Sequence, residues 1–413
     1  MTRSAHHAVV PYLALMAVSA VASFAKWFAF ARILGAEGFA YYALLELVGA
    51  YGLYLGGLGL VEGTSRVVPM MRGARRARAA RALAARATGA LLVTSTTAAI
   101  LFILLVSVTI DDARLADTLR AAAVFALVNN LFLMGTALIL GFDRPQAFAV
   151  VMVLKNVGAL LFGSLLGSAF GVVGVITVEV TIAGVLAFWC LALSRTGARP
   201  RFGKLRTIRV IFASGFPLMV NALLQNASRN IDRFFVGGAL GLAAFGQYSF
   251  AMTLALAGMV ALNILTQYVT PRLCYAQGAG SDLKQLVRRM DILVGALATA
   301  AIATLPLFVW AVERYGSSVF PDFALGLSLM PLVYVGATLQ VAQLYQGFLI
   351  ARGEGWRLTR QTAIVGILSI VGCVVGILNG ASAHYFAALF VSHRLLAAIL
   401  LRAAASRPVI RPL

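Results

Sequence analysis

The chain has 413 residues, of which 61% are hydrophobic and only 12% are charged. Soluble domains carry about 25% charged residues, so these proportions exclude an ordinary soluble protein. Lysine and arginine outnumber aspartate and glutamate by 34 to 14, which gives a net charge of +20. In a membrane protein such an excess is explained by basic cytoplasmic loops, so we expect no nucleic-acid partner.

Apolar stretches long enough to span a membrane recur along the whole chain. A spanning helix needs about 20 mainly apolar residues. The twelve stretches lie at about 8–30, 40–61, 88–110, 119–141, 147–168, 171–194, 211–236, 242–269, 290–312, 324–350, 362–378 and 384–401. We predict an all-α integral membrane protein with twelve transmembrane helices.

The distribution of basic residues predicts the orientation. With a cytoplasmic N-terminus, 25 of the 34 basic residues fall in cytoplasmic loops and termini, and four fall in outer loops. This bias predicts a multi-pass protein with both termini in the cytoplasm. The arginine-rich segment 72–86 is interpreted mainly as a topology determinant, with a second use in attracting anionic headgroups.

Enzyme and metal chemistry find little support in the sequence. Cys190, Cys274 and Cys373 lack CxxC or Cys/His spacing, and we interpret them as packing residues. His384 and His393 lack metal-binding spacing, and neither a phosphate-binding lysine loop nor a Gly-x-Ser-x-Gly motif is present. We therefore expect a protein that is not an enzyme and uses no cofactor or metal.

The two halves of the chain repeat one another. Three sites match at one offset of 206 residues: Leu34-Gly35-x-x-x-Phe39-x-x-Tyr42 with Leu240-Gly241-x-x-x-Phe245-x-x-Tyr248, Arg66 with Arg272, and Gly141-Phe142 with Gly347-Phe348. An even number of helices separates the copies, so both halves have the same orientation. We predict two pseudo-symmetric six-helix lobes, 1–206 and 207–413, that work by alternating access.

A polar stripe marks the seventh apolar stretch. Its members are Asn221, Gln225, Asn226, Ser228, Arg229, Asn230, Asp232 and Arg233. Unpaired polar groups are costly in lipid, so the stripe is expected to line a cavity. The alternative is a structural ion-pair cluster of Arg229, Asp232 and Arg233. In that cluster Asp232 is a better anchor than proton carrier, although it stays an ion-coupling candidate.

Five further ionisable residues lie within apolar stretches, where each costs roughly 2.5–3.5 kcal/mol: Lys26, Glu46, Lys155, Glu179 and Arg394. Lys26 either snorkels to the interface or faces a cavity as a cation for an anionic headgroup. Lys155 has the same two interpretations, with snorkelling toward the cytoplasm favoured. Glu46 and Glu179 have no cation near them in sequence, so they are candidate proton carriers, or else they pair with Lys26 or Arg229 across the bundle.

Residues 30–42, Phe-Ala-Arg-Ile-Leu-Gly-Ala-Glu-Gly-Phe-Ala-Tyr-Tyr, resemble the junction between helices 1 and 2 of polysaccharide flippases. These flippases belong to the multidrug, oligosaccharidyl-lipid and polysaccharide (MOP) exporter superfamily. Residues 214–218 and 230–236 resemble the start of their second lobe, and residues 270–272 resemble the end of their helix 8. The resemblance implies a MATE/MOP-like fold of two lobes around a cationic cavity.

The same resemblance implies a function and a site. It implies a flippase that moves polyprenyl-pyrophosphate-linked oligosaccharide from the inner to the outer leaflet of the bacterial cytoplasmic membrane, during O-antigen or exopolysaccharide synthesis. In related flippases the cation six residues before the position of Arg32 is linked to the pyrophosphate, and here that position holds Lys26. Arg229 and Arg233 are expected to assist it.

The sugars are expected to contact the amides of Asn221, Gln225, Asn226 and Asn230. The expected partners are the lipid-linked substrate and membrane lipids, with a polysaccharide polymerase and glycosyltransferases as further candidates. Two alternatives stay open. One is an ion-coupled multidrug or cation antiporter of the same superfamily, against which Arg229 and Arg233 count. The other is an integral-membrane glycan polymerase or acyltransferase.

Overall fold

The computed structural model describes residues 3–193, 205–279, 283–319 and 324–406, apart from some side chains within the helices. These residues fall into two compact units. The N-terminal unit runs to Met219 and includes Gly278, and the C-terminal unit contains Val220–Gln277 and the chain from residue 283 onward. The lobe boundary at residue 206 stays a prediction.

All regular elements in the described ranges are helical. The N-terminal unit contains α1 (Arg3–Gly57), α2 (Leu60–Gly73), α3 (Ala77–Thr109), α4 (Ala113–Gly141), α5 (Pro145–Leu193) and the beginning of α6 (Leu205–Gly278). The C-terminal unit contains most of α6, then α7 (Leu283–Val319), α8 (Ala324–Leu339), the 3₁₀ helix η2 (Gln340–Tyr345), α9 (Gln346–Arg352), α10 (Gly355–Leu378) and α11 (Ala383–Ala405).

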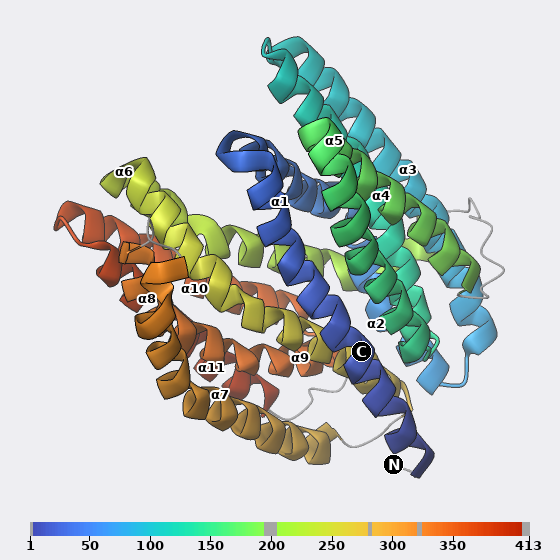
Figure 1. Ribbon diagram of the computed structural model, residues 1–413. Coiled ribbons are helices and arrows are strands. Elements are labelled where there is room, and N and C mark those ends of the chain that lie inside the picture. Colours follow the sequence, from blue (N-terminus) through green and yellow to red (C-terminus); the bar gives the residue numbers. More distant parts are fainter. Residues whose placement is uncertain (1–2, 194–204, 280–282, 320–323, 407–413) are drawn as a thin grey trace. The chain divides into compact units, whose positions relative to one another are not determined.

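Helix α1 contains the first two predicted spans. As a straight rod its 55 residues would be about 80 Å long. However, Lys26 Nζ lies 3.9 Å from Glu46 Oε1, whereas 20 residues of straight helix would separate them by about 30 Å. The chain therefore reverses direction between these residues, as the blue segment of Figure 1 shows.

Helices α5 and α6 each contain two predicted spans as well. Gly171 interrupts α5 with φ 60° and ψ −141°, a conformation that only glycine adopts readily. In α6, Tyr248 Oη donates to Asp232 Oδ2 at 2.8 Å, although 16 residues of straight helix would cover about 24 Å. With α8, η2 and α9 forming the tenth span together, the helices account for all twelve predicted spans.

The outer surface suits a lipid environment. Nine segments of the described chain are long and apolar enough to cross a membrane. Large apolar side chains of α3 point outward, with Leu101 62% exposed and Val108 85% exposed. In water such a surface would be costly, whereas lipid tails solvate it.

Two helices of the N-terminal unit approach each other through glycines. A methyl group at Gly215, near the start of α6, would overlap the carbonyl oxygen of Gly59 and lie 2.5 Å from the amide nitrogen of Gly63. Gly59 has φ 79°, in the left-handed region, at the N-cap of α2. The backbones of α2 and α6 can therefore meet only where side chains are absent.

We expect Gly215→Ala to destabilise the protein by about 1–3 kcal/mol or more, because the clash is with backbone that cannot rotate away. The check is the fraction of monodisperse protein that survives heating in detergent, followed by size-exclusion chromatography. Gly295→Ala is the matched control, since a methyl group at Gly295 meets no atom within 4 Å. Equal thermal loss in the two variants would contradict the close packing of α2 on α6.

Candidate functional site

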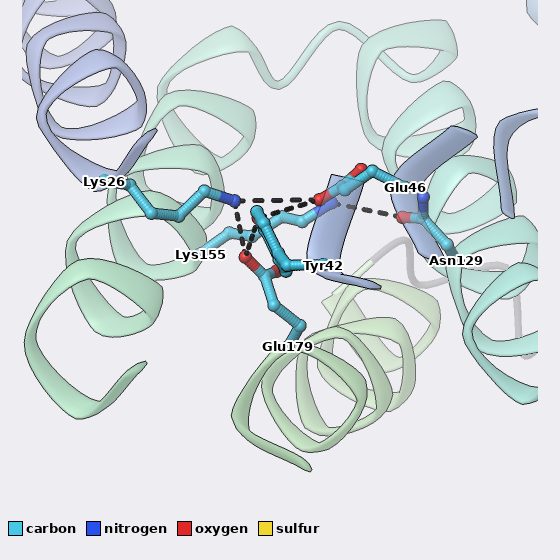
Figure 2. A network of polar contacts seen from close by, with 6 residues as sticks. All are labelled: Lys26, Tyr42, Glu46, Asn129, Lys155 and Glu179. Carbon is cyan, nitrogen blue, oxygen red and sulfur yellow. Dashed lines mark hydrogen bonds and ion pairs between the residues drawn. The ribbon is translucent and has the colours of Figure 1, made fainter. Parts of the chain in front are cut away.

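A network of charged and polar side chains lies inside the N-terminal unit (Figure 2). Its six members are Lys26, Tyr42 and Glu46 from α1, Asn129 from α4, and Lys155 and Glu179 from α5. These three helices pack closely on one another. The network therefore joins residues that are far apart in sequence.

Lys26 is the centre of this network. Its side chain is buried, as is that of Glu179, with which it forms an ion pair and a hydrogen bond. Glu46 Oε1 lies 3.9 Å from the same ammonium group, and the rings of Phe30 and Tyr42 lie 5.9 Å from it. Lys26 thus points into the helix bundle, and of the two sequence-based interpretations the structure favours the inward-facing one.

Tyr42 holds the two carboxylates in place. Its hydroxyl lies 3.1 Å from Glu46 Oε1 and 3.2 Å from Glu179 Oε1. A hydroxyl has one proton to donate, so it can donate fully to only one carboxylate at a time. The Tyr42 ring is fixed by Trp27 and Phe30, with ring centroids 5.3 Å and 5.2 Å away. The hydroxyl is therefore positioned to exchange between Glu46 and Glu179.

Lys155 extends the network toward α4. Its ammonium group donates to Asn129 Oδ1 at 3.1 Å and lies 4.4 Å from the ring centre of Phe132. The side chain thus points into the bundle, and the expectation that it snorkels toward the cytoplasm is wrong. Snorkelling would have left the amide oxygen of Asn129 and the Phe132 ring without the cation that both now contact.

The formal charges of the network balance. It contains two ammonium groups, Lys26 and Lys155, and two carboxylates, Glu46 and Glu179. With all four groups ionised the sum is zero, and one proton on either carboxylate makes it +1. The network therefore offers an anion a net positive charge only when it has also taken up a proton.

The predicted residues of α6 lie in the C-terminal unit. Asn221 is buried, and its Oδ1 accepts a hydrogen bond from Thr362 Oγ1 at 2.5 Å. Gln225 lines a polar pocket, and Asn226 is half-buried. Asp232 is 3% exposed and accepts the hydrogen bond from Tyr248. The side chains of Arg229, Asn230 and Arg233 lie outside the described residues.

The internal repeat relates the two units in a way that the three matched sites did not reveal. Lys26 and Asp232 are 206 residues apart, as are Tyr42 and Tyr248, and all four side chains are buried. In each unit the tyrosine hydroxyl donates to a carboxylate, which is Glu46 or Glu179 in the first unit and Asp232 in the second. Equivalent positions thus carry opposite charges.

Three members of the network were not among the predicted site residues: Tyr42, Asn129 and Lys155. A signal for Tyr42 was present, because it belongs to the repeated pattern and follows Lys26 by the spacing at which Tyr248 follows Asp232. Lys155 was noted as a charge within an apolar stretch, but neither for it nor for Asn129 does a local signal indicate which helix the side chain faces.

Solved structures with similar folds cover nearly the whole chain. A MOP superfamily transporter from Pyrococcus furiosus, described as having a binding pocket of reversed polarity, is 15% identical with a TM-score of 0.79 over 96% of this chain and 93% of its own. An outward-facing multidrug resistance MATE transporter is 16% identical with a TM-score of 0.78 and the same coverage. A Vibrio cholerae MATE transporter is 15% identical with a TM-score of 0.77 over 96% of this chain and 94% of its own.

The protein is therefore a multi-pass, all-α membrane protein with the MATE/MOP fold of twelve transmembrane helices in two six-helix lobes. Residues 29–312 match the family described as polysaccharide biosynthesis protein. The chain belongs to this family, and its fold is that of the solved MOP superfamily transporters. No protein of curated function matches it in sequence.

Proposed function

We propose that the protein is a flippase that moves polyprenyl-pyrophosphate-linked oligosaccharide from the inner to the outer leaflet of the bacterial cytoplasmic membrane. The observation that carries this proposal is the buried cation Lys26 inside a transporter of the polysaccharide biosynthesis family. A charged group inside a membrane bundle is costly and is kept where it has a function. A pyrophosphate is an anion that such a cation can bind.

In this proposal the network of the N-terminal unit binds the pyrophosphate and takes up a proton at the same time. Glu46 is the more accessible carboxylate, with its side chain 28% exposed against 2% for Glu179. Protonation of Glu46 removes one negative charge beside Lys26, so the ammonium group can attract the pyrophosphate more strongly. Release of the proton restores the neutral network and weakens anion binding.

In this proposal the predicted residues of α6 contact the rest of the substrate. Arg229 and Arg233 assist in binding the pyrophosphate, and the amides of the polar stripe, Asn221, Gln225, Asn226 and Asn230, contact the sugars. Asp232, like Glu46 and Glu179, remains a candidate for ion coupling. Both termini lie in the cytoplasm, and the lipid chain remains in the bilayer during transport. A polysaccharide polymerase and glycosyltransferases are the proposed neighbours in the membrane.

An ion-coupled antiporter for cationic drugs is the second candidate. It is favoured by the likeness to multidrug resistance MATE transporters and by the carboxylates of Glu46 and Glu179. Against it stands Lys26, which would repel a cation from those carboxylates. The Pyrococcus furiosus neighbour, whose reversed pocket polarity is described as suggesting a different function, supports a MOP fold that serves more than one kind of substrate.

We expect a deletion strain to accumulate complete lipid-linked oligosaccharide on the cytoplasmic leaflet, because assembly of the unit continues while its translocation stops. The measurement is extraction of lipid-linked glycans after labelling with a membrane-impermeant probe. Complementation with the wild-type chain should return the units to the outer leaflet. Units that reach the outer leaflet without the protein would refute the flippase, and increased drug sensitivity with normal glycans would establish the antiporter instead.

A further inference from the structure

A polar pocket lies within the C-terminal unit, separate from the charged network of the N-terminal unit. The pocket is small and partly open to its surroundings. Its polar lining comes from five helices: Gln225 and Ser228 of α6, Gln343 of η2, Gln346 of α9, Gln361 and Thr362 of α10, and His393 and Arg394 of α11. The helices therefore converge on it with their polar side chains.

Several of these polar groups have no partner within the described part of the chain. His393 is only 7% exposed, and neither of its buried ring nitrogens makes a hydrogen bond of normal geometry within the described residues. Gln361 Nε2 donates to the backbone oxygen of Leu400, while Gln361 Oε1 is buried and unsatisfied. An unsatisfied buried group costs about 1–3 kcal/mol, so groups of this kind that line a cavity point to a polar ligand.

The charge of the lining restricts the kind of ligand. Arg394 places a guanidinium group at the pocket, 5.0 Å from the ring centre of Phe390, and arginine stays protonated in proteins. None of the twelve described lining residues is acidic. The pocket thus disfavours a cation and suits an anion. Its four glutamines each supply an amide donor and an amide acceptor. This combination matches the hydroxyl groups of a sugar ring, which both donate and accept, better than it matches an inorganic anion, which mainly accepts.

Comparison with the first repeat indicates that the fold does not need these polar groups. Gln225 and Ser228 correspond, at the offset of 206, to Ser19 and Ala22. In the N-terminal unit Ser19 is buried and is satisfied by Asn156 Nδ2 at 2.8 Å, and Ala22 is buried in the bundle. The larger polar side chains of the second unit face a cavity instead.

We propose that this pocket binds one acidic sugar residue, a pyranose carrying a carboxylate, of the transported oligosaccharide. The inference rests on the proposed flippase function and adds the substrate class to it. Arg394 pairs with the carboxylate, and His393 and Gln361 contact the ring hydroxyls. The amides of the other lining glutamines supply further hydrogen bonds to the sugar. The C-terminal unit thereby selects the glycan through this pocket, while Lys26 of the N-terminal unit binds the pyrophosphate.

The test is binding to the full-length protein in lipid nanodiscs, measured as a shift of thermal unfolding with sodium glucuronate, glucose or inorganic phosphate as the probe. Glucuronate should stabilise the wild-type protein at concentrations where glucose and phosphate do not. His393→Leu and Arg394→Gln should each weaken the glucuronate affinity at least tenfold, because each removes hydrogen bonds to a charged or hydroxyl-rich ligand. His384→Leu is the matched control, since His384 lies on the same helix outside the pocket and should bind as the wild type does.

The alternatives give different results. Stabilisation by phosphate alone, or by glucose as well as by glucuronate, would overturn the assignment of an acidic sugar. Glucuronate binding that is unchanged in both pocket variants would place the sugar elsewhere. The leaflet assay on the deletion strain separates the two proposals: a flippase without glucuronate binding refutes only the pocket, whereas glycans on the outer leaflet without the protein refute the flippase.

Discussion

Export of the surface glycan is expected to fall about 30-fold or more when Lys26→Gln and Glu179→Gln are combined. The combination removes the cation proposed to bind pyrophosphate together with its buried partner, so no unpaired charge remains. Loss of one charge from a buried, hydrogen-bonded charge pair costs about 2–5 kcal/mol in binding, and about 2 kcal/mol corresponds to that factor. The measurement is surface glycan per membrane-inserted protein.

Removal of both partners is needed because the single change has two effects. Lys26→Ala would leave the carboxylate of Glu179 buried without its cation, and breaking a buried pair in this way costs about 3–5 kcal/mol of stability. Replacing both groups by neutral ones is often tolerated. Lost export in the double variant can therefore be read as lost function, provided that its melting temperature stays close to that of the wild type.

A second ion pair provides the matched control. Arg402 Nη2 lies 2.7 Å from Asp291 Oδ2 in the C-terminal unit, outside the network, and Arg402→Gln with Asp291→Asn neutralises it in the same way. This control should retain export, and Lys26→Arg, which keeps the positive charge, should retain a large part of it. Normal export at normal protein level in the Lys26/Glu179 double variant would show that the pair is only structural.

The network also shows what the sequence could predict of this protein and what it could not. Their positions within apolar stretches were enough to single out Lys26, Glu46 and Glu179, because a charged side chain is costly at membrane depth and is therefore rare there. Their pairing was one of several open alternatives, since Lys26 and Glu179 are 153 residues apart and only the packing of α1 on α5 brings them together. A one-dimensional pattern gives the depth of a residue in the membrane but not the helix that it faces.

The same limit applies to the C-terminal pocket and to the helix boundaries. In the sequence His393 has no carboxylate near it and no metal-binding spacing. Its place in a polar pocket is evident only from the structure, in which α6, α10 and α11 converge. Twelve spans followed from hydrophobicity, whereas the connection between the two antiparallel spans of α1 did not. Hydrophobicity indicates which residues contact lipid and does not determine the backbone conformation between two spans.

The two repeats differ in the charge at one equivalent buried position. Lys26 and Asp232 occupy equivalent positions of the repeat and carry opposite charges. In the proposed function the cation of the N-terminal unit binds the pyrophosphate, whereas the carboxylate of Asp232 is a candidate for ion coupling.

Glu46→Gln is expected to abolish the stimulation of transport by a proton gradient. The carboxylate of Glu46 accepts a hydrogen bond from Tyr42, lies 3.9 Å from Lys26 and is the more exposed of the two network carboxylates. A glutamine keeps its size but cannot take up a proton. The ratio of flux with and without an imposed gradient, measured in proteoliposomes with extracted lipid-linked oligosaccharide, should fall to about one.

Glu354→Gln is the control for this change. Glu354 is also a half-buried glutamate in an ion pair, with Arg357 at 2.7 Å, but it lies outside the network. It should leave the gradient ratio as in the wild type. An unchanged ratio in Glu46→Gln would remove Glu46 from the coupling mechanism and leave Glu179 and Asp232 as the remaining candidates.

Thermodynamic linkage supplies an independent check on the same residue. If protonation of Glu46 strengthens pyrophosphate binding, then pyrophosphate binding must strengthen protonation by the same factor, because coupling between two equilibria is reciprocal. The wild-type protein should therefore bind the lipid-linked substrate more tightly as the pH falls and take up a proton on binding. Glu46→Gln should bind with an affinity that no longer depends on pH, since it removes the group proposed to take up the proton. An affinity that stays equally pH-dependent would place the coupling proton on another group.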